Sequence, residues 1–344
     1  AHYIAKKMEE GLKLITPGIM FEEMGIDYIG PIDGHNLESL IDIFQKAKEL
    51  KKPVLIHCQT LKGKGYHKAE GHKSSWHGVS PFDIDSGKSL KKSSSKSATA
   101  MFSEILLELA KENPKIVGAT AAMPTGTGLD KLIELYPDRF WDVAIAEQHA
   151  VTSMSALAKE GFKPFCTIYS TFLQRGFDQV IHDSCILDLP IVFALDRAGL
   201  VGEDGETHQG VFDISFLRII PNMTLFAPRD ELSFSQAMHF ASKFQHPCSL
   251  RYPRGAFIDT PLKKSVEFQL GKSQLLQEAN GDILFIGYGN GVGRAYECST
   301  YLEQEIAILD LRFVKPLDTQ MLKELSGRYK KWFVFSDSVK MGGV

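Results

Sequence analysis

The stretch Trp141-Asp142-Val143-Ala144-Ile145-Ala146-Glu147-Gln148-His149 runs from apolar residues into a carboxylate and then into a segment with helical spacing. The apolar run 143–145 predicts a short buried strand, and 148–160 predicts a helix. A strand that leads directly into a helix is the unit from which parallel sheets are built. The stretch therefore predicts an α/β fold with Glu147 at the carboxyl end of a strand.

The same alternation continues on both sides of this stretch, from residue 98 to about 256. Helices are expected at 98–112, 148–160, 171–188 and 230–245, and strands at 116–118, 143–145, 165–168, 191–195, 224–226 and 249–252. This order predicts mostly parallel sheets with helices on both faces. Such sheets bind ligands at the carboxyl ends of their strands, where Glu147, Tyr169, Asp196 and Arg254 fall.

Two breaks divide the chain into three expected domains, 1–97, 98–265 and 266–344. The first domain contains a strand–helix–strand unit at 26–60 with Asn36 as the helix N-cap. It ends in a segment rich in Ser and Lys, 84–97, which predicts a solvated linker. After the second break, strands are expected at 283–287, 306–310 and 332–336, and helices at 292–304 and 317–326.

Bulk composition excludes several classes of protein. The 344 residues are 44% hydrophobic and 24% charged, with a net charge of -3, so neither nucleic acid nor an anionic membrane is an expected partner. The sequence lacks an eighteen-residue apolar run and an apolar signal core at its start. Its five cysteines contain no Cys-x-x-Cys, and they predict reduced thiols in a cytoplasmic protein.

Glu147 has two interpretations. An acid in the first turn of a helix is stabilised by the helix dipole, and Ala-Glu-Gln-His alone favours this reading. A buried acid can instead share a proton with a ring nitrogen near neutral pH, and the preceding apolar run supplies burial. Three blocks that follow favour the second reading: Tyr169-Ser170-Thr171-Phe172-Leu173-Gln174-Arg175, Asp196-Arg197-Ala198-Gly199 and Asp204-Gly205-Glu206-Thr207-His208-Gln209-Gly210.

Aromatic and cationic side chains in these blocks suit a flat, phosphorylated ligand. Phe172 can stack on a flat ring, and Tyr169 can donate a hydrogen bond, although core packing explains either residue alone. Arg175, Arg197 and Arg254 can bind phosphate bidentately, whereas each alone is typical of a surface ion pair.

The loop 198–213 holds four glycines together with Asp204 and His208. Glycines permit close approach to a ligand, and these two side chains can bind hydroxyl groups and transfer protons. A metal site is the rival interpretation, but the spacing offers too few ligands.

Three further candidates precede the linker. Lys62 and Tyr66, in Lys62-Gly63-Lys64-Gly65-Tyr66, suit contact with a diphosphate and a cofactor ring, and a basic turn is the alternative. His77 is a candidate acid or base by residue type, against the alternative of a surface histidine.

A glycine-rich motif follows a predicted strand in the last domain, Gly287-Tyr288-Gly289-Asn290-Gly291-Val292-Gly293. It has Val where a dinucleotide fingerprint needs Gly, so no nucleotide is expected there.

Together these blocks resemble the 1-deoxy-D-xylulose-5-phosphate synthase family, which belongs to the transketolase superfamily of thiamine-diphosphate enzymes. The resemblance covers the end of that family's first domain, its whole middle domain and part of its last domain, so a chain truncated at both ends is expected. It implies condensation of pyruvate with glyceraldehyde 3-phosphate to 1-deoxyxylulose 5-phosphate and carbon dioxide. The product feeds isoprenoid, thiamine and pyridoxal synthesis, and a cytoplasmic homodimer is implied.

The resemblance also assigns roles to residues. Glu147 activates the cofactor, Phe172 stacks on its pyrimidine, Lys62 and Tyr66 lie against it, and His77 assists proton transfer. The residues implied to line the substrate channel are Tyr169, Arg175, Arg197, Asp204, His208 and Arg254, with His208 also a catalytic candidate.

One departure concerns the metal. The family binds diphosphate and Mg²⁺ through Gly-Asp-Gly and a distant Asn, but the Gly281-Asp282 pair of this chain is followed by Ile283. The Mg²⁺ ligands are therefore expected outside this chain, in a missing N-terminal part or a second chain. Two alternatives stay open: another enzyme of the superfamily (a transketolase half or the β-type subunit of a 2-oxoacid dehydrogenase), and a non-catalytic fragment.

Overall fold

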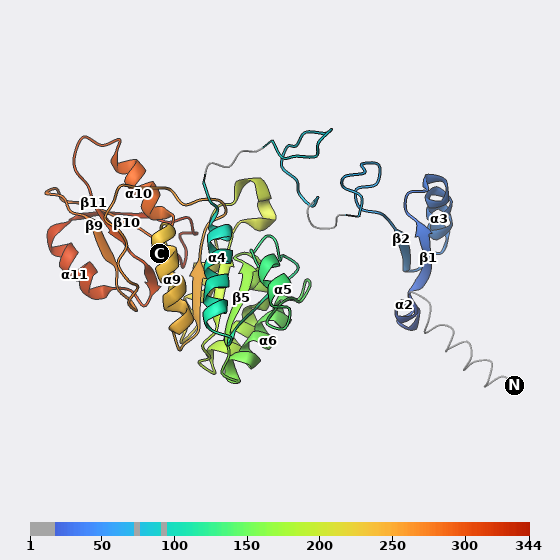
Figure 1. Ribbon diagram of the computed structural model, residues 1–344, viewed down its shortest axis with the longest axis horizontal. Helices are drawn as coiled ribbons and strands as arrows, with labels where there is room; N and C mark the ends of the chain where they lie inside the picture. The colour runs from blue at the N-terminus through green and yellow to red at the C-terminus, as the bar shows by residue number, and fades with distance from the viewer. Residues whose placement is uncertain (1–17, 72–75, 91–94) are drawn as a thin grey trace. The chain divides into compact units, whose positions relative to one another are not determined.

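The computed structural model describes residues 18–71, 76–90 and 95–344 (Figure 1). The chain forms two compact units, residues 1–92 and 93–344.

The first unit is built around a pair of parallel strands, β1 (Asp27–Asp33) and β2 (Val54–Gln59). A short helix, α2 (Ile19–Glu23), precedes them, and α3 (Leu37–Glu49) connects them. The Asn36 side chain accepts a hydrogen bond from the Ser39 N–H at 3.1 Å, so it caps α3. The expected strand–helix–strand unit is confirmed.

The first part of the segment predicted as a linker, 84–97, is folded. Phe82 and Ser89 form an antiparallel bridge, and the Tyr66 hydroxyl donates to a backbone carbonyl of this segment at 2.7 Å. Its remaining Ser- and Lys-rich part at 91–94 lies outside the described residues. Aromatic contacts, which composition does not reveal, organise the first half of the segment.

The second unit contains a seven-stranded sheet in the order β12-β7-β8-β6-β5-β3-β4. All neighbours run parallel except β12, which is antiparallel to β7. The strands are β3 (Ile116–Thr120), β4 (Phe140–Asp142), β5 (Lys163–Tyr169), β6 (Val192–Asp196), β7 (Thr224–Phe226), β8 (Cys248–Arg251) and β12 (Phe313–Lys315). The prediction of a mostly parallel sheet is confirmed.

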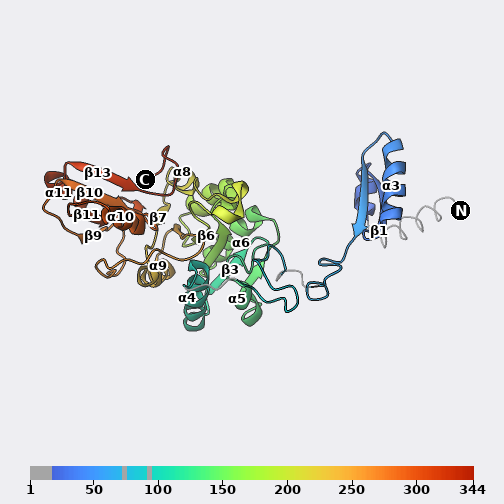
Figure 2. The same ribbon diagram turned by 90° about the horizontal axis from the view of Figure 1, so that it is seen from above.

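Three long helices cover this sheet: α4 (Ala98–Glu112), α6 (Glu147–Lys159) and α9 (Glu231–Lys243). Figure 2 shows α4 and α9 on one side of the sheet and α6 on the other. Successive strand residues point to opposite faces, so Phe165 and Val192 pack in the core under α4 and α9. Cys166 and Phe193 pack in the core under α6. Burial on both faces explains why the strands are apolar throughout rather than alternating.

The strand predicted at 143–145 is wrong, because the chain leaves the sheet after Asp142. The Asp142 carboxylate accepts hydrogen bonds from the backbone N–H groups of Ala122 at 2.6 Å and Ala144 at 3.0 Å. Ala144 has a φ of 61°, which a strand does not allow. This turn brings the chain directly into α6 at Glu147.

The single helix predicted at 171–188 is also wrong. The segment forms a 3₁₀ turn, η1 (Phe172–Gly176), then α7 (Phe177–Gln179), and then a π-helical turn, η2 (Val180–Cys185). A Cβ atom on Gly176 would lie 3.1 Å from a methyl group of Val151, so the segment packs closely on α6. Close packing and not helix propensity determines its shape.

The end of the second unit holds a four-stranded sheet in the order β13-β10-β11-β9, with β9 antiparallel to β11. Its strands are β9 (Gln274–Gln277), β10 (Ile283–Gly287), β11 (Ala307–Asp310) and β13 (Lys331–Phe335), and its helices are α10 (Gly291–Ser299) and α11 (Thr319–Arg328). The two sheets share a hydrophobic core that contains Leu225, Leu309 and Tyr288. The short helices α5 (Asp130–Leu135) and α8 (Asp213–Leu217) complete the second unit.

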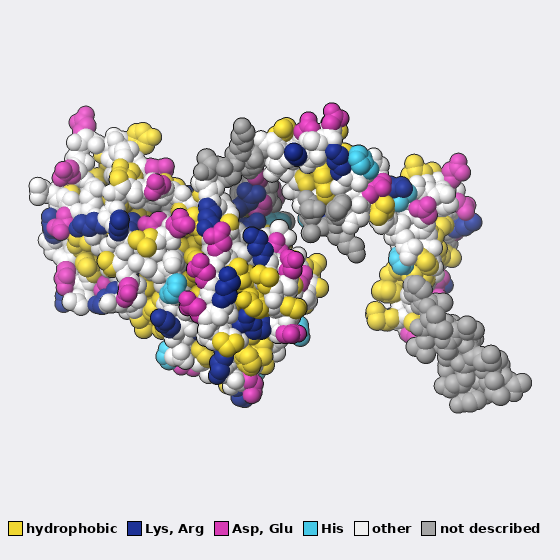
Figure 3. Space-filling model, in the orientation of Figure 1, with side chains coloured by type: hydrophobic (Ala, Val, Ile, Leu, Met, Phe, Trp, Pro, Cys, Tyr) yellow, Lys and Arg dark blue, Asp and Glu magenta, His cyan; other side chains and the backbone are white. Residues whose placement is uncertain are grey.

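The surface of the second unit that Figure 3 shows has acidic and basic side chains interspersed. In the part of the chain that the structure describes, none of the helices has the length and apolar character needed to cross a membrane.

Candidate functional site

The candidate site lies at the carboxyl edge of the seven-stranded sheet. Tyr169, the last residue of β5, pairs in register with Asp196, the last residue of β6. Because these strands are parallel, the loops that follow them leave the sheet at the same edge. Arg254, three residues beyond the end of β8, reaches the same group of side chains, as described below.

Glu147 is the first residue of α6 and is buried, with 4% of its side chain exposed. Among the described residues its one ion pair is with Arg175, at 3.9 Å between Nη1 and Oε2. That distance is too long for a hydrogen bond. An acid in the first turn that only stabilises a helix needs no burial. The burial of Glu147 therefore favours a carboxylate that binds a ligand.

An aromatic platform lies beside this acid. The rings of Tyr169 and Phe172 stack with centroids 5.8 Å apart and an angle of 11°. His208 meets both rings edge-on, at 6.3 and 5.1 Å. Burial raises the pKa of Tyr169 to about 12. The structure therefore brings together three residues that the sequence placed in two separate blocks.

Arg197 is fixed by contacts that the sequence did not indicate. Its guanidinium lies 4.3 Å from the centre of the Tyr169 ring and donates to the Asp196 carboxylate at 2.9 Å. Nη1 also donates to the Gly126 carbonyl at 2.5 Å and to the Thr99 hydroxyl at 3.2 Å. The backbone of Arg197 has a φ of 59°, a strained conformation that these contacts hold in place.

Thr99 and Gly126 are the positions that sequence reasoning missed. The Thr99 hydroxyl donates to the buried Asp196 carboxylate at 2.7 Å, across 97 residues of sequence. A Cβ atom on Gly126 would lie 2.1 Å from the Tyr169 hydroxyl, so glycine is required there. No local sequence pattern signals either contact, because both partners come from distant parts of the chain.

Asp204 links two of the predicted arginines. Its carboxylate lies 2.8 Å from Nε of Arg254 and 3.6 Å from Nε of Arg197. Arg254 also faces Glu203, at 3.2 Å, and the side chain of Glu203 is 68% exposed. Asp204 thus holds Arg197 and Arg254 near one another, and Glu203 is a second acid beside Arg254.

The loop that carries Asp204 and His208 contains two 3₁₀ turns, η3 (Gly202–Asp204) and η4 (Glu206–His208). Its base is closed by paired backbone hydrogen bonds between Gly199 and Gly210, at 2.7 and 2.8 Å. Nδ1 of His208 lies 2.9 Å from the Thr207 hydroxyl.

Lys62, Tyr66 and His77 lie in the first unit and form a cluster there. Nζ of Lys62 is 2.8 Å from Nδ1 of His77. The Tyr66 ring meets Trp76 edge-on, with centroids 5.2 Å apart. The structure thus pairs Lys62 with His77, and Tyr66 with Trp76, the residue before His77, within the first unit.

The chemistry of the second unit's residues fits the pyrimidine half of thiamine diphosphate. Glu147 is buried and its carboxylate has no hydrogen bond to any residue that the structure describes, so it can bind a ring nitrogen, and the aromatic pair offers a face for stacking. Over residues 18–71, 76–90 and 95–344, no group of three or more His, Cys, Asp or Glu side chains is arranged to hold a metal ion.

Family comparisons agree with this organisation along the chain. A model of the transketolase pyrimidine-binding domain matches residues 94–258, and a model of the transketolase C-terminal domain matches 271–344. A model of 1-deoxy-D-xylulose-5-phosphate synthase matches residues 1–60.

Curated relatives are similar over the whole chain. The 1-deoxy-D-xylulose-5-phosphate synthase of Sulfurimonas denitrificans is 75% identical over 344 residues, and that of Nitratiruptor sp. is 64% identical over 344 residues. In both comparisons the match covers 100% of this chain but 57% of the relative. The chain therefore spans little more than half the length of these relatives.

Solved structures show the same fold. A split-gene transketolase, described as an inactive beta4 tetramer, has a TM-score of 0.64 and 25% identity, covering 72% of this chain and 82% of that one. The transketolase of Campylobacter jejuni has a TM-score of 0.61 and 20% identity, covering 92% of this chain and 61% of that one.

Proposed function

This chain belongs to the 1-deoxy-D-xylulose-5-phosphate synthase family, and on that premise we propose that the full-length protein condenses pyruvate with glyceraldehyde 3-phosphate. The products are 1-deoxyxylulose 5-phosphate and carbon dioxide. The observation that carries the proposal is the juxtaposition, at one sheet edge, of buried Glu147, the Tyr169–Phe172 pair and the arginines around Asp204.

When bound, thiamine diphosphate with Mg²⁺ would supply a nucleophilic carbon for the reaction with the keto acid. Glu147 would hold the ring nitrogen of the pyrimidine by a shared proton, because its burial keeps water from competing for that hydrogen bond. Phe172 would stack on the pyrimidine face. As the resemblance implies, Lys62 and Tyr66 would contact the cofactor and His77 would assist proton transfer.

The substrate end of the site is formed by cations and proton donors. Arg197 and Arg254 bind the phosphate of the aldehyde. The phosphate replaces the exposed Glu203 as the partner of Arg254. Tyr169 donates a hydrogen bond to the substrate from its phenol, which is protonated at neutral pH. Arg175, Asp204 and His208 complete the channel.

The proposal extends to the organisation of the protein. The first domain ends with residues 1–97, the pyrimidine-binding domain spans 98–265, and the C-terminal domain begins at 266. A cytoplasmic homodimer completes the proposal; sedimentation of the purified full-length protein tests the dimer.

Mass spectrometry of reaction products tests the function. Full-length protein is incubated with pyruvate, glyceraldehyde 3-phosphate, thiamine diphosphate and Mg²⁺, and deoxyxylulose phosphate is expected. A parallel reaction replaces pyruvate with a ketose phosphate, the donor that a transketolase uses. Product only in the second reaction would reject the synthase and favour another enzyme of the superfamily.

A further inference from the structure

A buried ion-pair network lies behind the candidate site, and the proposed reaction does not use it. Arg251, the last residue of β8, is 5% exposed. Its Nε pairs with Asp213 at 2.8 Å, and its Nη1 pairs with Asp337 at 2.9 Å. Asp213 is 1% exposed and Asp337 is 9% exposed. Buried charges are retained only when they are paired, so removing one partner is costly.

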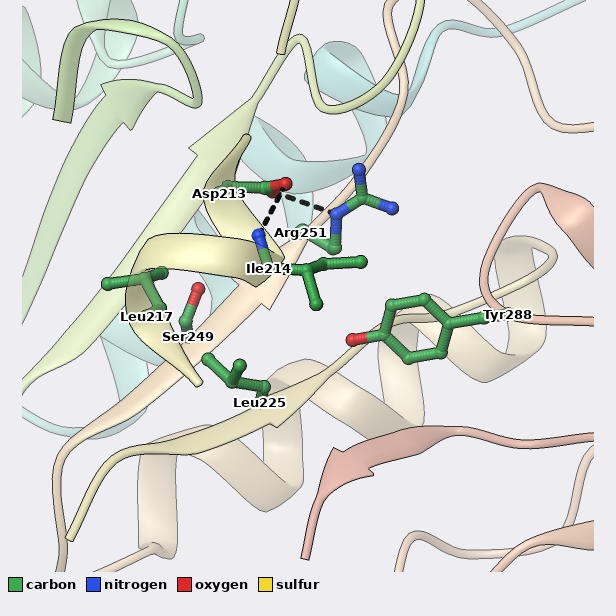
Figure 4. Close-up of a pocket in the computed structure, with 7 residues that line it drawn as sticks. All are labelled: Asp213, Ile214, Leu217, Leu225, Ser249, Arg251 and Tyr288. Atoms are coloured by element: carbon green, nitrogen blue, oxygen red, sulfur yellow. Dashed lines mark hydrogen bonds and ion pairs between the residues drawn. The ribbon is translucent and has the colours of Figure 1, made fainter. Parts of the chain in front are cut away.

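Figure 4 shows the middle of this network, with the Asp213 carboxylate bonded to Arg251 and the Tyr288 hydroxyl pointing toward the same space. The space is a cavity of about 10 Å³. Neither the Tyr288 hydroxyl nor Nη2 of Arg251 has a hydrogen-bond partner among the described residues. Most buried polar atoms have such a partner, so these two are exceptions in the described part of the chain.

Asp337 also meets the site loop directly. A Cβ atom added to Gly199 would lie 1.9 Å from Oδ2 of Asp337 and 2.3 Å from its Cγ. Gly199 pairs with Gly210 across the base of the loop that carries Asp204 and His208. The carboxylate therefore lies against the base of that loop.

The chain around Asp337 is attached to the same region. The Val339 N–H donates to the Val211 carbonyl at 3.0 Å, and the Ser215 hydroxyl donates to the Met341 carbonyl at 2.8 Å. The segment 336–343 thus follows the end of the loop and α8. Asp337 is the member of this segment whose side chain reaches both Arg251 and the loop.

We propose that Asp337 is a positioning residue: anchored by Arg251, its carboxylate sets the base of the loop 199–210 and so the place of Asp204 and His208 in the site. Its kinetic consequences rest on the proposed function, whereas its effect on the loop does not. Displacement of a site by about 1 Å costs up to roughly 100-fold in rate, so the effect is measurable.

Two glycine substitutions separate the contact between Gly199 and Asp337 from the effect of backbone strain. Gly199→Ala places a methyl group against the Asp337 carboxylate at a φ of 85°. Gly161→Ala is the matched control: its φ is 82°, its Cβ would have only the Lys115 amine within 4 Å, at 3.8 Å, and it lies outside the site. Both variants carry the same backbone strain, and only the first presses on Asp337.

The test combines two measurements on the full-length protein: hydrogen exchange of the peptide 199–210, and kcat and KM for glyceraldehyde 3-phosphate. Asp337→Asn and Gly199→Ala are expected to speed exchange in that peptide and to raise KM about 10-fold or more, with a smaller change in kcat. Gly161→Ala is expected to leave both measurements unchanged. The effects of Gly199→Ala and Asp337→Ala are expected to be less than additive in the double variant, because the carboxylate that the methyl group meets at 1.9 Å is then gone, whereas the backbone strain and the Cβ atom of residue 337, at 3.0 Å, remain.

Wild-type exchange and KM in Asp337→Asn would overturn the positioning role, as would additive effects in the double variant. A uniform loss of folded protein is identified by thermal unfolding and by equal exchange in peptides far from the loop, and this outcome also counts against the proposal. If the wild type makes no product, the proposed function fails, and the exchange comparison still decides whether Asp337 sets the loop.

Discussion

Nη1 of Arg175 lies 3.9 Å from Oε2 of Glu147, close enough for attraction and too far for a hydrogen bond. The arginine side chain is 52% exposed, whereas the acid is 4% exposed. The carboxylate is therefore buried without a hydrogen-bonding partner from this cation. A group in that state is available for a ligand, and this relationship leads to the first prediction.

Glu147→Gln should reduce turnover of the full-length protein by at least about 100-fold, since positioned proton transfer contributes about 10²–10⁴-fold. The amide keeps the shape of the side chain and loses the shared proton. Steady-state product formation measures the effect. Glu160→Gln, an exposed position just after the same helix, is the matched control and should keep normal turnover. Turnover above a tenth of normal in Glu147→Gln would exclude the assigned role.

Arg254→Ala should raise KM for glyceraldehyde 3-phosphate by roughly 10- to 100-fold, the equivalent of one or two charge-assisted hydrogen bonds. Arg254→Lys should recover only part of the loss, because an ammonium group lacks the planar fork. The control is the reaction with unphosphorylated glyceraldehyde, for which the KM of Arg254→Ala should change little. Equal losses with both aldehydes would mean that Arg254 does not recognise the phosphate.

Tyr169 should remain protonated well above the ordinary phenol pKa of about 10. Burial raises the pKa of Tyr169 in the folded protein to about 12. Because the folded value exceeds the unfolded one, the contribution of this group to stability is complete below about pH 10 and is lost as the pH rises through about 12.

The absorbance of tyrosinate, measured as the difference between wild type and Tyr169→Phe, follows this titration. We expect the difference to appear only above about pH 11, between the two pKa values. A difference already centred on the ordinary value would contradict the burial of Tyr169 in the folded protein.

Thr99→Val should lower the free energy of unfolding by about 1–3 kcal/mol, because it leaves the buried Asp196 carboxylate and Arg197 each short of one hydrogen bond. Chemical denaturation measures the change. Thr99→Ser keeps the hydroxyl group and is the matched control. The same unfolding free energy in Thr99→Val and wild type would show that the hydroxyl contributes nothing to holding Asp196.

Several parts of the fold could be predicted because their information is local. The helix at 98–112 and the strand at 283–287 have the predicted bounds. Apolar residues repeat at helical spacing in the first, and a short run of apolar residues, two of them β-branched, forms the second. The strand at 224–226 also has the predicted bounds, and most other elements differ by one or two residues at their ends. The helix predicted at 292–304 ends five residues early, at Ser299.

The sequence missed what depends on distant partners. β12 is only three residues long and becomes a strand because the edge of β7 is available to it. The turn at Ala144 exists because Asp142 accepts two backbone N–H groups, one of them from Ala122. Neither feature has a signature in its own residues.

The candidate site, like the fold, has features that the sequence predicts and features that depend on distant partners. The order of its blocks along the chain predicts that the acid, the aromatic pair and the arginines gather at one edge of the sheet, because parallel strands bring their carboxyl ends to one edge whatever their separation in sequence. Only the tertiary structure decided that Glu147 is buried, that Asp204 joins Arg197 to Arg254, and that Asp337 lies against Gly199. Residue types and their spacing indicate where helices and strands form. The burial and the pairing of charges arise instead from packing between segments far apart in the chain.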